Sequence, residues 1–164
     1  MVRFSPVKTP EDFKAIEALA FPIWREHYSP IIGAAQVEYM LEKFQTASAV
    51  ECQARQGSLY FLIQSPKGEN LGFLSVTPRP TELFLSKLYL LKNQRGRGYA
   101  REALEFIQNL ALQRDLRRVT LTVHKQNPSL KAYQALGFKI LEPVMTDIGG
   151  GFVMNDYRME LDLA

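Results

Sequence analysis

Three observations predict an α/β (α+β) domain built around one mixed β-sheet. The chain has 164 residues, of which 46% are apolar and 23% charged, and these values are typical of one globular domain with a sizeable core. Segments with the apolar spacing of strands and of helices follow one another as strand, helices, three strands, helix, strand, helix and two strands. A turn rich in glycine and arginine joins the fourth strand directly to a helix. We therefore expect residues 1–164 to form a single domain.

Charge, cysteine content and hydropathy narrow the class of protein. The net charge of +3 suits an anionic ligand such as coenzyme A, but it is too small to predict a nucleic-acid partner. Cys52 is the only cysteine, which excludes an intramolecular disulfide, and we expect it to lie in the core as a small side chain. Residues 1–6 lack the apolar segment of a signal peptide, and no apolar run approaches the roughly 18 residues that span a bilayer. We therefore expect no membrane partner and a cytoplasmic location.

The first elements are a strand and a long helix. Residues 2–7 have the composition of a strand. Thr9 is expected to cap the helix, with Pro10 in its first turn and Asp12 completing a capping box. Pro30 is expected to end this helix. The aromatic segment just before Pro30 either clusters under a loop or forms one wall of an acceptor site.

Two short helices and three strands come next. Apolar residues share one stripe over residues 36–44, which predicts a helix, and a second helix is expected over 48–56. Runs of apolar and β-branched residues separated by turn-forming residues predict strands. These strands are expected at residues 59–64, 71–77 and 82–91.

The second half of the chain alternates between helix and strand. Apolar residues spaced three and four apart predict a helix over residues 100–114, and strict alternation predicts a strand over 118–123. The strand–helix–strand unit over 82–123 should form a right-handed parallel crossover. Asn127 is expected to cap a further helix that stops at Gly137. Two last strands are expected around a triple-glycine turn, at residues 138–146 and 152–161.

The glycine-rich turn, Arg95-Gly96-Arg97-Gly98, has the physical features of an anion-binding site. The first N–H groups of the following helix have no partner within it, and the helix dipole adds roughly half a positive charge there. Glycines let backbone N–H groups approach a ligand closely, so the turn suits a phosphate or pyrophosphate. Arg101 stands where a dinucleotide fingerprint has its third glycine, and the Gly-Lys-Ser/Thr of a P-loop is absent. A basic surface loop that caps the helix is the alternative.

Two separate motifs resemble those of the GNAT superfamily of acyl-CoA-dependent N-acetyltransferases. Arg95-x-x-Gly98-x-Ala100 after a strand is similar to the phosphate-binding signature of the superfamily. About thirty residues later, Asn127 is followed by Tyr133 and then by Gly-Phe, although many members have a step of seven residues where this chain has six. The resemblance implies the GNAT fold, which is a mixed, mostly antiparallel sheet of six to seven strands flanked by helices. It also implies acetyl-CoA as co-substrate and no metal.

The resemblance further implies roles for residues of both motifs. Tyr133 would be the general acid that protonates the departing coenzyme A thiolate, and a buried core tyrosine is the alternative. Asn127 would line the cofactor channel, and a simple helix cap is the alternative. The other cofactor-binding positions run from the strand that would receive the pantetheine arm to the turn that would cradle the pyrophosphate: Leu88, Tyr89, Leu90, Arg95, Gly96, Arg97, Gly98, Tyr99 and Ala100.

The general base is not assigned by the sequence. An amine that attacks a thioester must first lose a proton, because the pKa of a lysine-like ammonium group is about 10. A carboxylate can accept this proton directly or through water. Glu26, Glu82, Asp147 and Asp156 are all candidates, and His124, just after a strand, is expected to be a loop residue.

The C-terminal segment bears on the acceptor and on assembly. Residues 147–157 resemble a bacterial branch that includes diamine and polyamine acetyltransferases, so a polyamine or diamine is one expected acceptor. A peptide amine, either a protein N-terminus or a lysine side chain, is another. The alternatives without catalysis are an acyl-CoA-binding module and a basic interaction domain. Because Cys52 lies far from both motifs, we expect direct transfer in a ternary complex. The last two strands offer edges at which a homodimer can pair.

Overall fold

The strands of the chain form one sheet. The computed structural model describes residues 1–163, and within them seven strands lie in the order β1-β2-β3-β4-β5-β7-β6. Neighbouring strands are antiparallel except β4 and β5, which are parallel. This confirms the mixed, mostly antiparallel sheet and the parallel unit over residues 82–123. In chain order the elements are β1 (Arg3–Pro6), α1 (Pro10–Ile32), α2 (Ala34–Met40), η1 (Leu41–Gln45), α3 (Ala47–Arg55), β2 (Leu59–Gln64), β3 (Asn70–Pro78), β4 (Leu83–Leu90), η2 (Lys92–Gln94), α4 (Tyr99–Gln113), β5 (Arg118–His124), α5 (Ser129–Ala135), β6 (Lys139–Gly149) and β7 (Phe152–Asp162).

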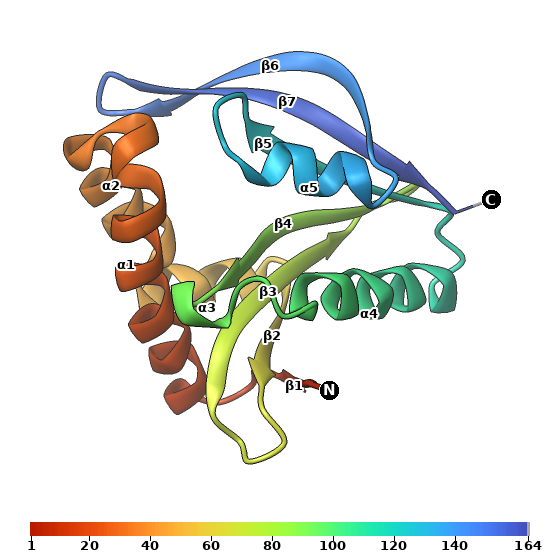
Figure 1. The fold of residues 1–164 in the computed structure, drawn as a ribbon. Helices are drawn as coiled ribbons and strands as arrows, with labels where there is room; N and C mark the ends of the chain where they lie inside the picture. The colour runs from red at the N-terminus through yellow and green to blue at the C-terminus, as the bar shows by residue number, and fades with distance from the viewer. Residues whose placement is uncertain (164) are drawn as a thin grey trace.

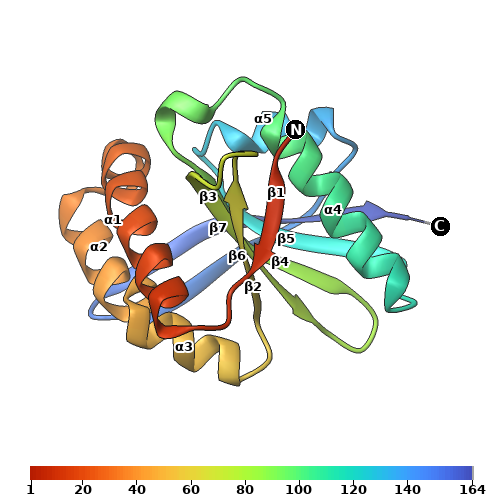
Figure 2. The ribbon, with the colours of Figure 1, turned by 90° about the horizontal axis from the view of Figure 1, so that it is seen from below.

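Helices cover both faces of the sheet (Figure 1, Figure 2). The helices α1, α2 and α3 lie on one face, and α4 lies on the other. The internal strand β3 contributes to both cores: Phe73 belongs to the cluster of Ile16 and Trp24, whereas Leu74 belongs to the cluster of Ile107. Successive side chains of a strand point to opposite faces, so β3 is buried on both sides.

The helix α1 begins as predicted but ends later. The Thr9 hydroxyl accepts a hydrogen bond from the Asp12 N–H at 3.2 Å, and the Asp12 carboxylate accepts one from the Thr9 N–H at 3.0 Å, which confirms the capping box. The prediction that Pro30 ends the helix is wrong, because α1 continues to Ile32 and ends at Gly33, whose φ is 88°. A proline in the last turn removes one N–H donor but keeps a helical φ. The buried face of α1 stabilises the helix through this position.

Two further predictions for the helical region need correction. The helix expected over residues 36–44 is α-helical as far as Met40 and continues as the π-helix η1. Cys52 is exposed, so the expectation that it lies in the core is wrong. Residues two positions apart in a helix are separated by about 200° around its axis. Val50 faces the core and is fully buried, and Cys52 therefore faces solvent.

The strands β4 and β5 pair only where they begin. The paired residues are Leu83 with Val119 and Phe84 with Thr120. A bulge then leaves Ser86 of β4 without an opposite residue on β3. From there β4 stays with β3 while β5 stays with β7, so β4 and β5 diverge, and α5 lies beside the opening (Figure 1).

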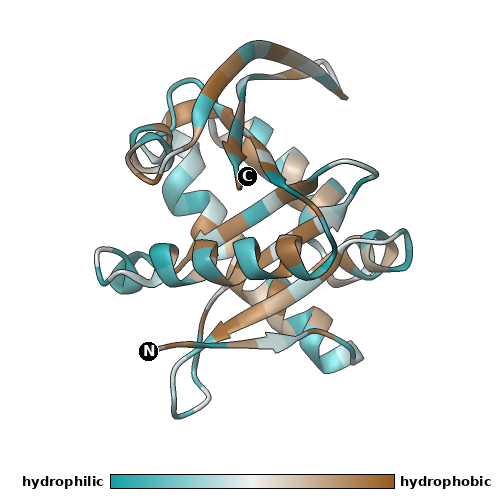
Figure 3. Ribbon diagram, turned by 90° about the vertical axis from the view of Figure 1, so that its right-hand side faces the viewer, coloured by the Kyte–Doolittle hydropathy of each residue, from teal (hydrophilic) through white to brown (hydrophobic). Residues whose placement is uncertain are grey.

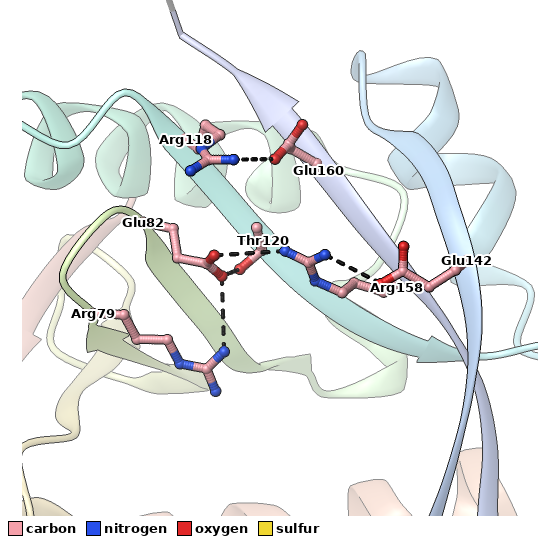
Figure 4. Close-up of polar contacts among 7 residues, drawn as sticks. All are labelled: Arg79, Glu82, Arg118, Thr120, Glu142, Arg158 and Glu160. Carbon is pink, nitrogen blue, oxygen red and sulfur yellow. Dashed lines mark hydrogen bonds and ion pairs between the residues drawn. The ribbon is translucent and has the colours of Figure 1, made fainter.

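A cluster of charged side chains joins the strands at the closed end of this opening (Figure 4). The Glu82 carboxylate lies 3.7 Å from the Arg79 guanidinium and 3.5 Å from that of Arg158, and it accepts a hydrogen bond from the Thr120 hydroxyl. Arg158 of β7 also pairs with Glu142 of β6 at 3.2 Å. Glu82, one of the four candidate bases, is therefore occupied in connecting β4, β5 and β7.

Glu82→Ala is expected to lower the free energy of unfolding by about 1–2 kcal/mol, because Arg158 and the Thr120 hydroxyl lose a partner that is only 12% exposed. Urea unfolding followed by circular dichroism measures this change. Glu51→Ala is the matched control, because Glu51 forms an exposed ion pair with Arg55 within α3. It should change stability by less than about 0.5 kcal/mol. Equal effects of the two substitutions would contradict the stabilising role of Glu82.

The hairpin of β6 and β7 exposes apolar side chains at the edge of the sheet. Ile140, Leu141, Met145 and Val153 are exposed there, and Figure 3 shows hydrophobic colour on this outer hairpin as well as on the central strands. The strand β6 is an edge, whereas β7 lies between β5 and β6 and offers none, which corrects the expectation of two pairing edges. The homodimer stays a prediction. No helix within residues 1–163 has the length and apolar character needed to cross a membrane.

Candidate active site

The glycine-rich turn forms an open cradle at the start of α4. Gly96 and Gly98 have φ values of 77° and 84°, which is the left-handed region that favours glycine. A Cβ added to either glycine would meet no atom within 4 Å, so the space above both is free. No side chain caps the N-terminus of α4. A cavity of about 270 Å³ adjoins this turn, and Gly96, Gly98, Tyr99 and Ala100 are among its walls. Unpaired helix N–H groups beside open space fit a pyrophosphate.

Arg95 is held in place beside this cradle. Its Nε donates to the Leu90 carbonyl at 3.1 Å, and its guanidinium pairs with the Glu26 carboxylate of α1 at 2.8 Å. Arg95 lines the cradle cavity, whereas Arg97 does not: its side chain is exposed and donates to the Asn93 carbonyl. Glu26, a second candidate base, therefore serves as the partner of Arg95.

Glu26→Gln is expected to tighten the binding of acetyl-CoA by about two- to fivefold, because the carboxylate competes with a bound pyrophosphate for Arg95. The gain is small because both side chains are about one-third exposed. Isothermal titration calorimetry with acetyl-CoA measures it. Glu38→Gln is the matched control, since Glu38 forms the same kind of ion pair with Arg25 away from the cradle, and it should leave affinity unchanged. Weaker binding by Glu26→Gln would contradict the competition.

Three cavities adjoin one another across the opening between β4 and β5. The central one, of about 110 Å³, shares walls with the cradle cavity at Leu88, Leu90, Arg95, Ser129 and Tyr133. On its other side it shares walls with a cavity of about 480 Å³, at Tyr28, Ser86, Lys87, Tyr89, Thr122 and Val123. The row therefore runs from the glycine turn, past the diverging strands, to the side of the sheet covered by α1 and η1.

Tyr133 of α5 lies at the junction of the cradle and central cavities. It is partly buried, and its ring lies edge-on to that of Phe138 with centroids 5.5 Å apart. Burial and the nearby Tyr28 raise the pKa of its phenol above the ordinary value of 10, so the hydroxyl keeps its proton. The side chain thus packs against the core and also faces both cavities.

Asn127 connects the start of α5 to α1. Its Oδ1 accepts from the Ser129 N–H at 2.9 Å and lies 3.0 Å from His27 Nε2, and its Nδ2 donates to the Tyr28 hydroxyl at 3.2 Å. It therefore caps the turn into α5, which begins at Ser129, one residue later than predicted. Asn127 is buried and lines the central cavity, and its amide is already bonded to groups of the protein.

Asp156 is the one carboxylate among the residues, within 1–163, that line these three cavities. It is 7% exposed, its Oδ1 has no hydrogen-bond partner among the described residues, and burial raises its pKa to about 6. Asp147 is exposed and caps the turn by accepting from the Gly149 N–H at 2.8 Å. Of the four candidate bases, only Asp156 lines one of these three cavities.

His124 faces Asp156 across the pair of β5 and β7 and lines the same cavity. Its Nδ1 accepts from the Gln126 N–H at 3.1 Å, and burial together with Lys125 lowers its pKa below 6.5, so the ring is neutral at pH 7. His124 is the last residue of β5, whereas the sequence predicted a loop. Within residues 1–163 no three His, Cys, Asp or Glu side chains gather in a way that would bind a metal ion.

Lys87 is a residue of the site that sequence reasoning missed. Its Nζ is surrounded by four oxygens: the Phe44 carbonyl at 3.1 Å, the side-chain carbonyls of Gln45 and Gln53 at 3.1 and 2.9 Å, and the Tyr60 hydroxyl at 2.6 Å. Burial lowers its pKa to about 7. A lysine in an amphipathic strand normally points to solvent. Only the packing of η1 and α3 against β4 encloses this one.

A family model described as the acetyltransferase (GNAT) family matches residues 14–138. This segment includes α1 from Lys14 onward, the cradle, Tyr133 and Phe138. No curated protein sequence matches the chain.

Solved structures of similar fold come from several organisms. The PaiA N-acetyltransferase of Thermoplasma acidophilum, in complex with coenzyme A, is 18% identical with a TM-score of 0.80, and 99% of each chain is covered. An acetyltransferase of Thermus thermophilus is 25% identical with a TM-score of 0.65, covering 98% of this chain and 97% of that one. The spermidine N-acetyltransferase of Vibrio cholerae, in complex with coenzyme A and spermine, is 14% identical with a TM-score of 0.73, covering 99% and 95%. These likenesses extend over nearly the whole chain.

Proposed function

The chain belongs to the acetyltransferase (GNAT) family, and we propose that it transfers an acetyl group from acetyl-CoA to a primary amine by direct attack in a ternary complex. The observation that carries the proposal is the row of three adjoining cavities, with an anion cradle at one end and a buried carboxylate at the other. Such a row gives each substrate its own entrance. It lets the two substrates meet in the central cavity, between β4 and β5.

The cradle end of the row suits coenzyme A. Gly98, Tyr99 and Ala100 form the N-terminus of α4, which lies beside the open space of the cradle cavity. Arg95 adds a positive charge there. Leu88 to Leu90 of β4 have no strand partner on the β5 side, so their backbone is available to a pantetheine arm. Bound in this way, acetyl-CoA would supply the thioester to the central cavity.

The other end of the row suits the amine. The Asp156 carboxylate takes one proton from the ammonium group, and the freed nitrogen attacks the thioester carbonyl carbon, forming the C–N bond. A raised pKa makes Asp156 a better base than an ordinary aspartate while leaving it mostly ionised at pH 7. The proton then leaves to solvent.

Tyr133 completes the transfer. As the carbon–sulfur bond breaks, its phenol donates a proton to the sulfur. The thiol pKa of about 8.5, by analogy with cysteine, lies below that of the phenol, so this transfer is uphill by itself and has to be coupled to the return of a proton to the phenol. The second proton of the attacking nitrogen restores the phenol, so the sum is an N-acetylated amine, coenzyme A and one proton. Asn127 is a positioning residue here, since its bonds to Tyr28 and Ser129 fix the start of α5.

The acceptor amine is either a small molecule, such as a polyamine or diamine, or a peptide amine. The resemblance of residues 147–157 to polyamine acetyltransferases favours a polyamine, and the Vibrio cholerae neighbour gives this some support. Release of free thiol from acetyl-CoA over a panel of amines and short peptides tests the proposal. Binding of acetyl-CoA without turnover of any acceptor would instead favour an acyl-CoA-binding module.

Tyr133→Phe is expected to lower kcat by about 10- to 100-fold with little change in the affinity for acetyl-CoA, because the variant keeps the ring packing and loses only the proton donor. The thiol-release assay and calorimetry measure the two quantities separately. Tyr157→Phe is the matched control, since Tyr157 lies on β7 outside the three cavities. Full activity of Tyr133→Phe would mean that another group protonates the thiolate.

A further inference from the structure

The largest cavity of the row carries few charges. Its volume is about 480 Å³, and the groups of its wall that carry charge near neutral pH are Asp156, which is mostly ionised, and Lys87, whose pKa of about 7 leaves it protonated in about half of the molecules at pH 7; His124 is neutral. Seven of the other wall residues have uncharged polar side chains, and the rest are apolar or aromatic residues of α1, α2, η1, β4, β5, β6 and β7. They include Trp24, Met40, Phe44, Ile148 and Met154.

Lys87 lies in this wall without an acidic partner. All four of its hydrogen-bond partners are neutral oxygens, and no carboxylate within residues 1–163 lies within 4.0 Å of its Nζ. The Tyr60 hydroxyl donates its own proton to Gln53, so it presents a lone pair to Lys87. Three N–H donors facing four acceptors favour the ammonium form, which opposes the effect of burial.

These charges discriminate between kinds of amine. The first ammonium group of an acceptor is matched by Asp156. A second ammonium group, further along the same molecule, finds no other carboxylate in the wall and meets the positive field of Lys87. Unlike charges across a binding surface attract, and like charges set against one another select against a ligand. Burial of an apolar part of the acceptor against the apolar walls is favourable instead.

We propose that the acceptor carries a single ammonium group on an apolar or aromatic body, and that Lys87 selects against diamines and polyamines. This inference rests on the proposed function, because it assumes that the amine enters the cavity of Asp156. It departs from the polyamine expected from the C-terminal resemblance. Several ammonium groups are matched best by several carboxylates, and this cavity has one among the described residues.

The first test compares amines on the wild-type protein. The kcat/KM for thiol release is measured with 2-phenylethylamine, 3-methylbutylamine, 1,4-diaminobutane and spermidine. Calorimetry measures the binding of each amine to the protein saturated with coenzyme A, which requires no turnover. At pH 6, where Lys87 with a pKa of about 7 is mostly protonated, both monoamines should exceed both polycations by about tenfold in each measurement, and the difference should shrink as Lys87 loses its proton above pH 7.

The second test asks whether Lys87 causes the difference. Lys87→Met keeps the length and apolar stem of the side chain and removes the charge, so the preference for monoamines over spermidine should shrink by about tenfold. Lys67→Met, an exposed lysine in the loop between β2 and β3, should keep the wild-type preference. The melting temperature of each variant checks folding. The wild-type comparison stands even where Lys87→Met folds poorly.

The outcomes separate the two proposals. Equal or better use of spermidine by the wild-type protein would overturn this inference and support the proposed function. Tight binding of monoamines without turnover would support the inference about the cavity and overturn the acetyl transfer. An unchanged amine preference in folded Lys87→Met would overturn the role of Lys87. Absence of both binding and turnover, for every amine, would overturn both proposals.

Discussion

Asp156→Asn is expected to lower kcat/KM for amine acetylation by about 10²- to 10⁴-fold, the usual contribution of a general base. Asparagine has nearly the same size and cannot accept the proton. Asp156 is the one carboxylate lining the cavities among the described residues, so no neighbouring acid can replace it. Affinity for acetyl-CoA should stay the same, because Asp156 does not line the cradle cavity.

The pH dependence of kcat/KM in the wild-type protein should show the ionisation of Asp156. Burial raises the pKa of Asp156 to about 6, and the base acts when ionised, so kcat/KM should rise with pH to a plateau with a midpoint near pH 6. In Asp156→Asn this acidic limb should be absent. A limb that persists in the variant, with the same midpoint, would assign it to another group.

Stability distinguishes a catalytic from a structural role for Asp156. Folding raises the pKa from 3.8 to about 6, so the folded state favours the protonated acid. This stabilisation is complete below pH 3.8 and is lost as pH rises through about 6. At pH 8 the buried carboxylate destabilises the protein, and Asp156→Asn should therefore be as stable as the wild type or more so. Low activity with lower stability at pH 8 would indicate a structural role.

Asp147→Asn is the matched control for these measurements. Asp147 lies on the neighbouring strand β6, is exposed and lines none of the three cavities. Its Oδ1 caps the Gly149 N–H, and an asparagine can make the same hydrogen bond. Activity and pH profile should match the wild type, which would attribute the effect at position 156 to its place in the cavity.

Local patterns predicted most of the fold because their physics is local. The capping box at Thr9, the helical spacing after the glycine turn and the alternation over 118–123 each depend on residues within a few positions. Pro30 misled because a proline sets only its own φ and one missing donor, whereas the burial of α1 extends along the whole helix. The prediction that Cys52 is buried was wrong because it followed the general preference of cysteine for the core. The position of Cys52 on α3 places it on the exposed side of the helix.

The site was predictable in part for a similar reason. The cradle lies within one strand–turn–helix unit, so its residues could be found from their spacing. The base could not be found in this way, because the cavity that Asp156 lines is shared with residues of α1 and η1, about a hundred residues or more earlier in the chain. Glu26 and Glu82 were equal candidates until their ion pairs with Arg95 and Arg158 separated them from Asp156. Lys87 was missed because its enclosure depends on η1 and α3.

Gly98→Asp is expected to weaken the binding of acetyl-CoA by about 100-fold or more. Gly98 precedes the first residue of α4, and the open space above it is where a pyrophosphate would lie. An aspartate there fills this space, caps the helix N–H groups with its own carboxylate and repels phosphate oxygens. A 100-fold loss of affinity corresponds to about 2.8 kcal/mol of binding free energy, because each factor of ten is about 1.4 kcal/mol. Loss of the helix N–H groups as phosphate donors, together with repulsion between the aspartate and the phosphate oxygens, accounts for a loss of this size.

Gly68→Asp separates this effect from backbone strain. Gly68 has a φ of 87°, almost the same as the 84° of Gly98, and a Cβ added to it also meets no atom within 4 Å. Both substitutions therefore place a side chain at a positive φ, which costs about 1–2 kcal/mol each, and they differ in place, because Gly68 lies in the loop between β2 and β3. Similar losses of stability in both variants, with acetyl-CoA binding lost only in Gly98→Asp, would attribute binding to the cradle. Retained affinity in a folded Gly98→Asp would instead remove the pyrophosphate from this turn, since strain alone is shared by the control.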